Sequence, residues 1–249
     1  MELLSKVALI TGGTSGIGAA TALTLARGGA DIVLVGRHAS DQACQTQSDV
    51  RALGRRCELI LADVAIPAEA EDCVQETATR LGRLDILVHA AGGPAGGSIL
   101  DLTPETWRAA FAIHVDAAFY LCRATIPLMR QQGEGAILLI SSVAGLRGVL
   151  NAIAYCTVKG AVLQFTRALA RDLAADNIRV NCVAPGIIRT PFHATMTPEA
   201  KRNNIENRIP LHREGRPEDV AEVIRMLVTN EFITGESVTI DGGMTSRVP

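Results

Sequence analysis

The sequence predicts a doubly wound α/β fold, with a seven-stranded parallel sheet and helices on both faces. Two observations predict it. Short apolar runs recur along the 249 residues, and stretches with helical periodicity separate them. Because the apolar runs lack polar alternation, each is expected to be buried on both faces, as strands of a parallel sheet are. Repeated strand–helix alternation then implies right-handed crossovers within one sheet.

The elements follow in a regular order. Short apolar runs, several of them β-branched, predict strands at residues 7–10, 32–35, 59–61, 86–88, 137–140, 180–183 and 238–240. Helical periodicity predicts helices at residues 16–27, 41–53, 67–81, 104–129, 154–175 and 217–228. Proline opens three of these helices, where its missing N–H costs nothing, at Pro67, Pro104 and Pro217. This order is that of a Rossmann-like domain.

No linker or repeat interrupts the alternation, so residues 1–249 are predicted to form a single domain. The exception to regular alternation is residues 187–216, which have weak periodicity and contain Pro, His, Thr and Arg. A loop of this length within a compact domain usually has a function, often as a lid. We therefore expect a substrate loop there.

Composition excludes several classes of protein. Apolar residues make up 48% of the chain, which excludes a disordered protein, and a net charge of −2 does not suggest a nucleic-acid binder. The six cysteines form no CxxC pair, so we expect free thiols and no metal site. No apolar run was found that approaches the ~20 residues of a membrane span. We expect a cytoplasmic protein that acts on a small molecule.

A glycine-rich turn follows the first predicted strand and precedes the first helix. Its spacing is Gly-x-x-x-Gly-x-Gly. Glycines let the backbone approach a pyrophosphate, and the helix N-terminus offers free N–H groups with a partial positive charge. The turn predicts a nucleotide site that includes Gly12, Thr14, Ser15, Gly16, Ile17 and Gly18.

The end of the second strand distinguishes the cofactors. A carboxylate there would accept hydrogen bonds from the adenosine ribose of NAD, but this chain has Gly36 followed by Arg37. A guanidinium suits the 2′-phosphate of NADP, so we favour NADP over NAD. Other small or polar residues follow the third and fourth strands at the ligand-binding edge of the sheet: Asp63, Val64, Ala90, Ala91 and Gly92.

Three residues form a candidate catalytic group. Tyr155 and Lys159 are four residues apart at the start of a helix and share one face, and Ser142 closes the fifth strand. A phenol is a poor base at neutral pH, but a nearby ammonium, together with the positive charge of an oxidised nicotinamide, favours the phenolate. Tyr155 could then exchange a proton with an alcohol or carbonyl, with Ser142 bound to the same substrate oxygen.

Together these motifs resemble the short-chain dehydrogenase/reductase family over essentially the whole length. Further matching motifs are Asn181 to Gly186 and Asp241-Gly242-Gly243. The resemblance implies hydride transfer between a nicotinamide cofactor and a substrate carbon, with Tyr155 as the acid/base. It also implies a homotetramer, and a nicotinamide pocket lined by Pro185, Gly186, Ile188 and Thr190.

The chain departs from the family pattern at two histidines. His114 stands where the family usually has an Asn that supports a proton relay to the catalytic Lys. A relay through a residue that titrates near neutrality would shift the acidic limb of the pH–rate profile, whereas a buried structural His would not. His89 also replaces an Asn, and we interpret it as structural.

The substrate is the least certain prediction. Residues expected to border it include Ser142, Arg147, Tyr155, Gly186 and His193, with few aromatics. This lining favours a small polar substrate such as a sugar, polyol or hydroxy acid, with Arg147 meeting an anionic group. A 3-oxoacyl-(acyl-carrier-protein) reductase is an alternative on the same fold. A non-catalytic nucleotide-sensing protein is an alternative from another class.

Overall fold

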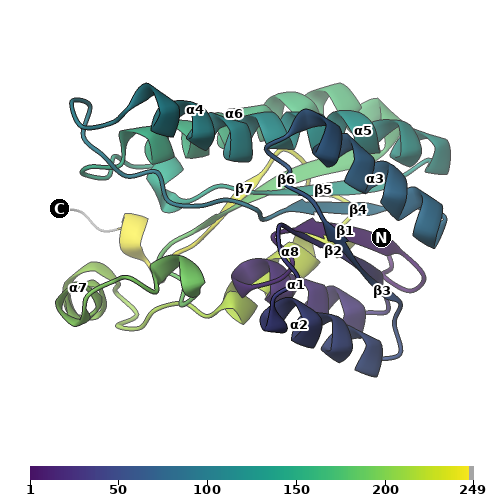
Figure 1. The fold of residues 1–249 in the computed structure, drawn as a ribbon, viewed down its shortest axis with the longest axis horizontal. Coiled ribbons are helices and arrows are strands. Elements are labelled where there is room, and N and C mark those ends of the chain that lie inside the picture. The colour runs from purple at the N-terminus through teal and green to yellow at the C-terminus, as the bar shows by residue number, and fades with distance from the viewer. Residues whose placement is uncertain (247–249) are drawn as a thin grey trace.

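A computed structural model describes residues 1–246, which form a seven-stranded sheet with helices on both faces (Figure 1). The strand order is β3-β2-β1-β4-β5-β6-β7, and every neighbouring pair is parallel. The strands are β1 (Val7–Thr11), β2 (Asp31–Gly36), β3 (Cys57–Leu61), β4 (Ile86–His89), β5 (Gly135–Ile140), β6 (Ile178–Pro185) and β7 (Ser237–Ile240). The predicted doubly wound fold is confirmed.

Helices cover the two faces separately. One group contains α1 (Gly16–Arg27), α2 (Asp41–Ala52) and α8 (Pro217–Thr229). The other contains α3 (Pro67–Leu81), α4 (Pro104–Phe111), α5 (Ala117–Gln132) and α6 (Ile153–Leu173). In Figure 1 the first group lies below the sheet and the second above it.

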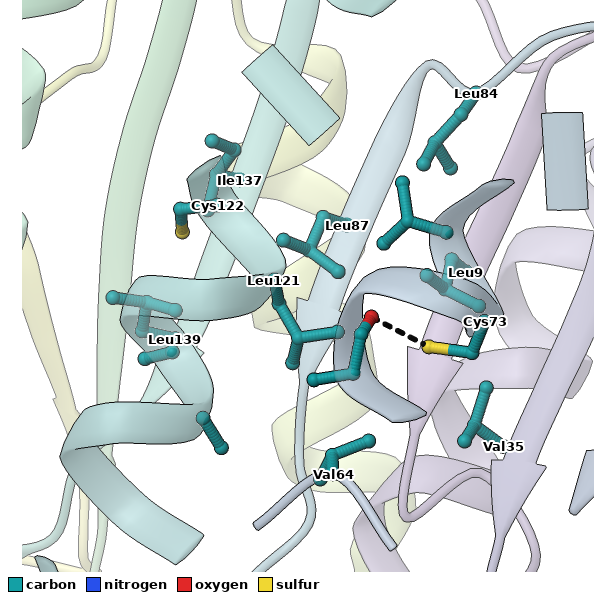
Figure 2. Close-up of a cluster of buried hydrophobic side chains, with 14 of the residues drawn as sticks. Leu9, Val35, Val64, Cys73, Leu84, Leu87, Leu121, Cys122, Ile137 and Leu139 are labelled. Atoms are coloured by element: carbon teal, nitrogen blue, oxygen red, sulfur yellow. Dashed lines mark hydrogen bonds between the residues drawn. The ribbon is translucent and has the colours of Figure 1, made fainter. Parts of the chain in front are cut away.

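Each buried strand supplies both cores, because successive side chains point to opposite faces. In β1, Leu9 joins the core beneath α3, α5 and α6, while Ile10 joins the core beneath α1 and α8. Figure 2 shows the first of these cores, where Leu87 lies beside Leu121 of α5 and Leu9 lies beside Cys73 of α3. The Cys73 thiol donates to the Ala70 carbonyl. Two buried faces explain why these strands read as unbroken apolar runs.

The long helix predicted at residues 104–129 contains a feature that the sequence did not reveal. A π-helical turn, Ala112–Asp116, joins α4 to α5 and contains His114. Such turns insert one residue into the helical repeat and occur often at functional sites. Here the turn lies against the carboxyl end of β4, where His89 contacts Ile113.

The stretch Pro104–Gln132 is apolar and long enough to cross a membrane, by length and composition alone, which the sequence analysis missed. Core helices pass the same test. The inner face of this one is packed in the core, where Leu121 and Met129 are fully buried.

The segment predicted as a substrate loop, residues 187–216, is more ordered than its weak periodicity suggested. It contains a short 3₁₀ turn, Pro191–His193, then α7 (Pro198–Asn203) and a second π-helical turn, Asn204–Arg208. Its two ends meet in a parallel bridge between Ile188 and Gly215. The segment is therefore closed at its base, beside the carboxyl ends of β6 and β7.

Candidate active site

Two positions in the glycine turn between β1 and α1, Gly12 and Gly18, have no room for a side chain. A Cβ on Gly12, where φ is +65°, would lie 2.8 Å from the Ala91 nitrogen. A Cβ on Gly18 would lie 2.2 Å from the Gly12 carbonyl oxygen. These contacts hold the turn against β4 and bring the N-terminus of α1 close to it.

The first turn of α1 leaves its backbone donors available. Its N-cap residue, Ser15, makes no side-chain cap hydrogen bond, and no acidic residue lies in the first turn. The first N–H groups of a helix need an outside partner, and an anion supplies one. The turn therefore has the chemistry of a phosphate site.

Two adjoining cavities lie along the carboxyl edge of the sheet. One, of about 550 Å³, runs from the glycine turn to the ends of β2 and β3, and the other, of about 470 Å³, runs from the same turn to Tyr155. They share Gly12, Ser15, Ala91, Gly92 and Gly93. Every site residue predicted from the sequence lines one cavity or the other, with the exception of Arg147.

Arg37 is the basic residue that lines the larger cavity. It is exposed at the end of β2 and has no hydrogen-bond or ion-pair partner within residues 1–246. A Cβ on the preceding Gly36 would lie 2.7 Å from the Thr14 side chain, so a residue with a carboxylate would fit there only if the Thr14 side chain moved. The Asp63 carboxylate accepts from the Ala65 N–H at 3.1 Å and so shapes the turn after β3.

The smaller cavity brings Ser142, Tyr155 and Lys159 together. Lys159 Nζ lies 5.6 Å from the centre of the Tyr155 ring, and Ser142 lines the same cavity as these two residues. Lys159 Nζ also donates to the Ile140 carbonyl at 2.7 Å. The Ser141 hydroxyl donates to the Lys159 carbonyl at 2.7 Å, which fixes α6 against the end of β5.

Burial controls the protonation of this group. It lowers the pKa of Lys159 to about 8, because the loss of water disfavours the charged ammonium. Burial also raises the pKa of Tyr155, and the nearby Ser142 hydroxyl opposes the shift. In the chain without its cofactor, burial therefore favours the protonated phenol of Tyr155.

His89 ties the glycine turn to the π-helical turn. Its Nδ1 lies 2.8 Å from Thr11 Oγ1 and its Nε2 lies 3.1 Å from the Ile113 carbonyl oxygen. A carbonyl can only accept, so Nε2 carries the proton and Nδ1 accepts from the Thr11 hydroxyl. The Ala91 N–H donates to the same hydroxyl at 3.3 Å. These contacts suit the structural role expected of His89.

His114 holds the backbone on the other side of this turn. Its Nε2 donates to the Gly93 carbonyl at 3.0 Å, and a Cβ on Gly92 would lie 2.4 Å from the imidazole Cε1. The ring meets Tyr155 edge-on, with centroids 5.8 Å apart. Burial, assisted by the charge of Lys159, lowers the pKa of His114 to about 3. His114 is thus neutral near pH 7, contrary to the expected titration, and its part in a proton relay stays a prediction.

The two buried histidines predict acid sensitivity of the fold. Burial lowers the pKa of His89 to about 4 and that of His114 to about 3, whereas both are near 6.5 in the unfolded chain. The unfolded chain therefore binds more protons below pH 6.5. Each histidine should cost on the order of 2 kcal/mol of unfolding free energy between pH 7.5 and pH 5.

Urea unfolding at the two pH values measures this cost. We expect His89→Asn and His114→Asn to lose less stability on acidification than the wild type. The exposed His38, replaced by Asn, serves as the control. Equal losses in all four proteins would contradict the assignment of neutral buried histidines.

The two remaining residues predicted to contact the substrate, His193 and Arg147, lie in different places. His193 lines the smaller cavity, where its Nδ1 donates to the Ile188 carbonyl at 2.9 Å. Arg147 instead points to the C-terminal turn, with Nη2 3.5 Å from the Thr245 carbonyl oxygen. The predicted anion contact at Arg147 is therefore not supported by its position.

Several lining residues were not singled out from the sequence. Phe192 lies over Tyr155 with ring centroids 5.9 Å apart, and Arg208 brings a second cation to the cavity. Apolar side chains make up most of the remaining wall: Val143, Val149, Ile187 and Met244. These residues come from the segments after β5, β6 and β7, where no periodic pattern marks which side chains face inward.

Comparison with known proteins agrees with this geometry. Residues 12–245 match a family model described as "Enoyl-(Acyl carrier protein) reductase". The 3-oxoacyl-[acyl-carrier-protein] reductase FabG of Thermotoga maritima is 35% identical over 246 residues, covering 98% of this chain and 99% of that protein. The human Dehydrogenase/reductase SDR family member 4 is 36% identical, covering 99% of this chain and 90% of that protein.

Solved structures give the same picture. A putative short-chain alcohol dehydrogenase from Sinorhizobium meliloti superimposes with a TM-score of 0.94 at 30% identity, covering 99% of both chains. Levodione reductase superimposes with a TM-score of 0.92 at 29% identity, covering 98% of this chain and 99% of that one.

Proposed function

Because the chain belongs to the short-chain dehydrogenase/reductase family, we propose that it transfers a hydride between NADP and a secondary alcohol or ketone. It is an oxidoreductase of that family. The observation that carries the finer proposal is the convergence of Ser142, Tyr155 and Lys159 on a cavity that continues into the glycine turn. Neither a binding module nor a structural protein needs that arrangement.

The residues present fit a nicotinamide cofactor. Gly12, Gly18 and the N-terminus of α1 would hold the pyrophosphate, and Arg37 would meet a 2′-phosphate. Pro185, Gly186, Ile188 and Thr190 line the cavity beside Lys159, where the nicotinamide ribose would lie. The bound cofactor supplies or accepts the hydride.

The proton that the carbonyl oxygen needs comes from the protein's own side chains. Burial keeps Tyr155 protonated, so in ketone reduction its hydroxyl donates a proton to the carbonyl oxygen. Ser142 positions that oxygen through a second hydrogen bond. The ammonium of Lys159, 5.6 Å from the Tyr155 ring, stabilises the phenolate that forms. Protonation from solvent then restores the phenol.

The cavity wall favours a substrate with an apolar body. Val143, Val149, Phe192 and Met244 present no hydrogen-bonding groups. A sugar or polyol would leave hydroxyls without partners against them, which is costly. Of the predicted substrate classes we therefore retain hydroxy acids and the corresponding ketones.

A 3-oxoacyl reductase remains a second candidate. Relatives with this name are 35% and 36% identical, and an acyl chain suits the apolar wall. Comparing a 3-oxoacyl thioester on acyl-carrier protein with the same thioester on a small thiol separates the candidates. A large preference for the carrier-bound form would favour the acyl-carrier reductase.

Absorbance at 340 nm tests the proposed function. Purified protein would be given NADPH or NADH and a panel of ketones, oxo acids and oxo esters, and the reverse reaction would be run with alcohols. Turnover with NADPH supports the proposal. Tight binding of a cofactor without turnover on any member would favour a nucleotide-sensing protein instead.

The cofactor preference should depend on Arg37. Charge-assisted hydrogen bonds to a phosphate contribute about 1.5–3 kcal/mol. We therefore expect Arg37→Ala to raise the KM for NADPH about 10- to 100-fold and to leave that for NADH nearly unchanged. Arg27→Ala, at an exposed residue remote from both cavities, is the control. An unchanged NADPH affinity in Arg37→Ala would refute the preference for NADP.

A further inference from the structure

The basic residues of the 187–216 segment differ in how their charges are balanced. Arg189 and Lys201 both lie beside the buried carboxylate of Glu214, at 3.2 Å and 3.8 Å. Arg213 is paired with Asp219 at 2.8 Å. Arg208 lies beside none of the described carboxylates, although it lines the smaller cavity.

Arg208 is nevertheless held in place. Its Nη1 donates to the Oδ1 atom of Asn204 at 2.8 Å, one π-helical turn earlier. Asn204 is only 3% exposed, and its amide nitrogen lies 3.2 Å from Met196 Sδ. A buried neutral amide thus orients the guanidinium and leaves its charge unneutralised. The remaining N–H groups of Arg208 are available to a ligand.

The cavity around Arg208 has a positive character. Its lining includes two formal cations, Lys159 and Arg208, and no Asp or Glu among the described residues. The guanidinium of Arg208 is exposed, so a ligand can reach it, and apolar side chains such as Phe192 and Val149 line the same cavity. An anion on the substrate would find its partner there, while its carbonyl lies at Tyr155.

We propose that Arg208 binds a carboxylate of the substrate, so that the enzyme prefers oxo acids, or the matching hydroxy acids, to their neutral esters. This inference rests on the proposed function, because it concerns the same cavity. The guanidinium fork suits a planar carboxylate, with two parallel hydrogen bonds. Arg208 is a specificity residue in this account and takes no part in the proton transfer.

The test compares charged and neutral substrates of the same shape. The probes are acetoacetate, its longer-chain homologues and the methyl ester of each, with NADPH, for the wild type and Arg208→Gln. We expect the acid-to-ester ratio of kcat/KM to fall about 10- to 100-fold in Arg208→Gln, as loss of a charge-assisted contact predicts. Arg208→Lys should retain part of the preference.

Arg202→Gln is the matched control, since Arg202 is exposed on α7 and does not line the cavity. The KM for NADPH reports on the other anion that could meet Arg208, the cofactor phosphate. A rise in that KM with an unchanged acid-to-ester ratio would overturn the inference. The proposed function would stand, and the inference about Arg208 would fall, if the esters were reduced in a Tyr155-dependent reaction and the acid-to-ester ratio of kcat/KM were the same in the wild type and in Arg208→Gln. No turnover of any probe by protein that binds NADPH would overturn both.

Discussion

Tyr155→Phe is expected to lose about 10²- to 10⁴-fold in kcat/KM, the range typical of a missing general acid. Phenylalanine keeps the ring that packs against His114 and Phe192, at 5.8 Å and 5.9 Å, and removes only the hydroxyl. Cofactor affinity should therefore change little. Steady-state rates at 340 nm, together with cofactor binding by calorimetry, measure the two effects separately.

The chain offers a natural control for this variant. It has only two tyrosines, and the other, Tyr120, lies in α5 away from both cavities. Tyr120→Phe should keep full activity. If Tyr155→Phe retained wild-type turnover, the proton would have to come from another group, and the proposed role of Tyr155 would be wrong.

Gly18→Ala is expected to cause the largest loss of cofactor binding. Its Cβ would lie 2.2 Å from the Gly12 carbonyl oxygen, so the glycine turn would have to move away from α1. Overpacking of this kind costs about 1–3 kcal/mol. If this whole cost destabilises the conformation of the turn that binds NADPH, the Kd for NADPH should rise about 5- to 150-fold.

Calorimetry with NADPH, alongside circular dichroism, checks the glycine prediction. Gly148→Ala is the control, because a Cβ there would meet nothing within 4 Å and the residue lies outside both cavities. An unchanged Kd in Gly18→Ala would mean that the pyrophosphate does not depend on this turn.

The seven strands could be predicted from the sequence because both of their faces are buried. Leu9 and Ile10 enter opposite cores, so the pattern of the run alone indicates its environment. The glycine turn was equally clear, since Gly12 and Gly18 occupy positions that no side chain can share. Tyr155 and Lys159 could be placed together because helical spacing puts them on one face.

Other features depend on tertiary contacts that leave no local pattern. The π-helical turn at Ala112–Asp116 adds one residue to a helix whose periodicity otherwise continues. The neutrality of His114 follows from burial and from Lys159, which is 45 residues further along the chain. Arg147 was predicted to face the substrate and Arg208 was not singled out, because both lie in irregular segments where the sequence does not show which side chain faces the cavity.

The central claim is that this chain reduces a ketone by hydride transfer, with the proton supplied at Tyr155. The most direct test uses NADPH with deuterium at both C4 positions of the dihydronicotinamide, in protonated buffer, with product analysis by mass spectrometry. Hydride transfer from the cofactor should place one deuterium on the carbinol carbon of the product. We expect this product from the wild type and from Tyr120→Phe, and almost none from Tyr155→Phe. Product without deuterium, or deuterated product formed equally well by Tyr155→Phe, would contradict it.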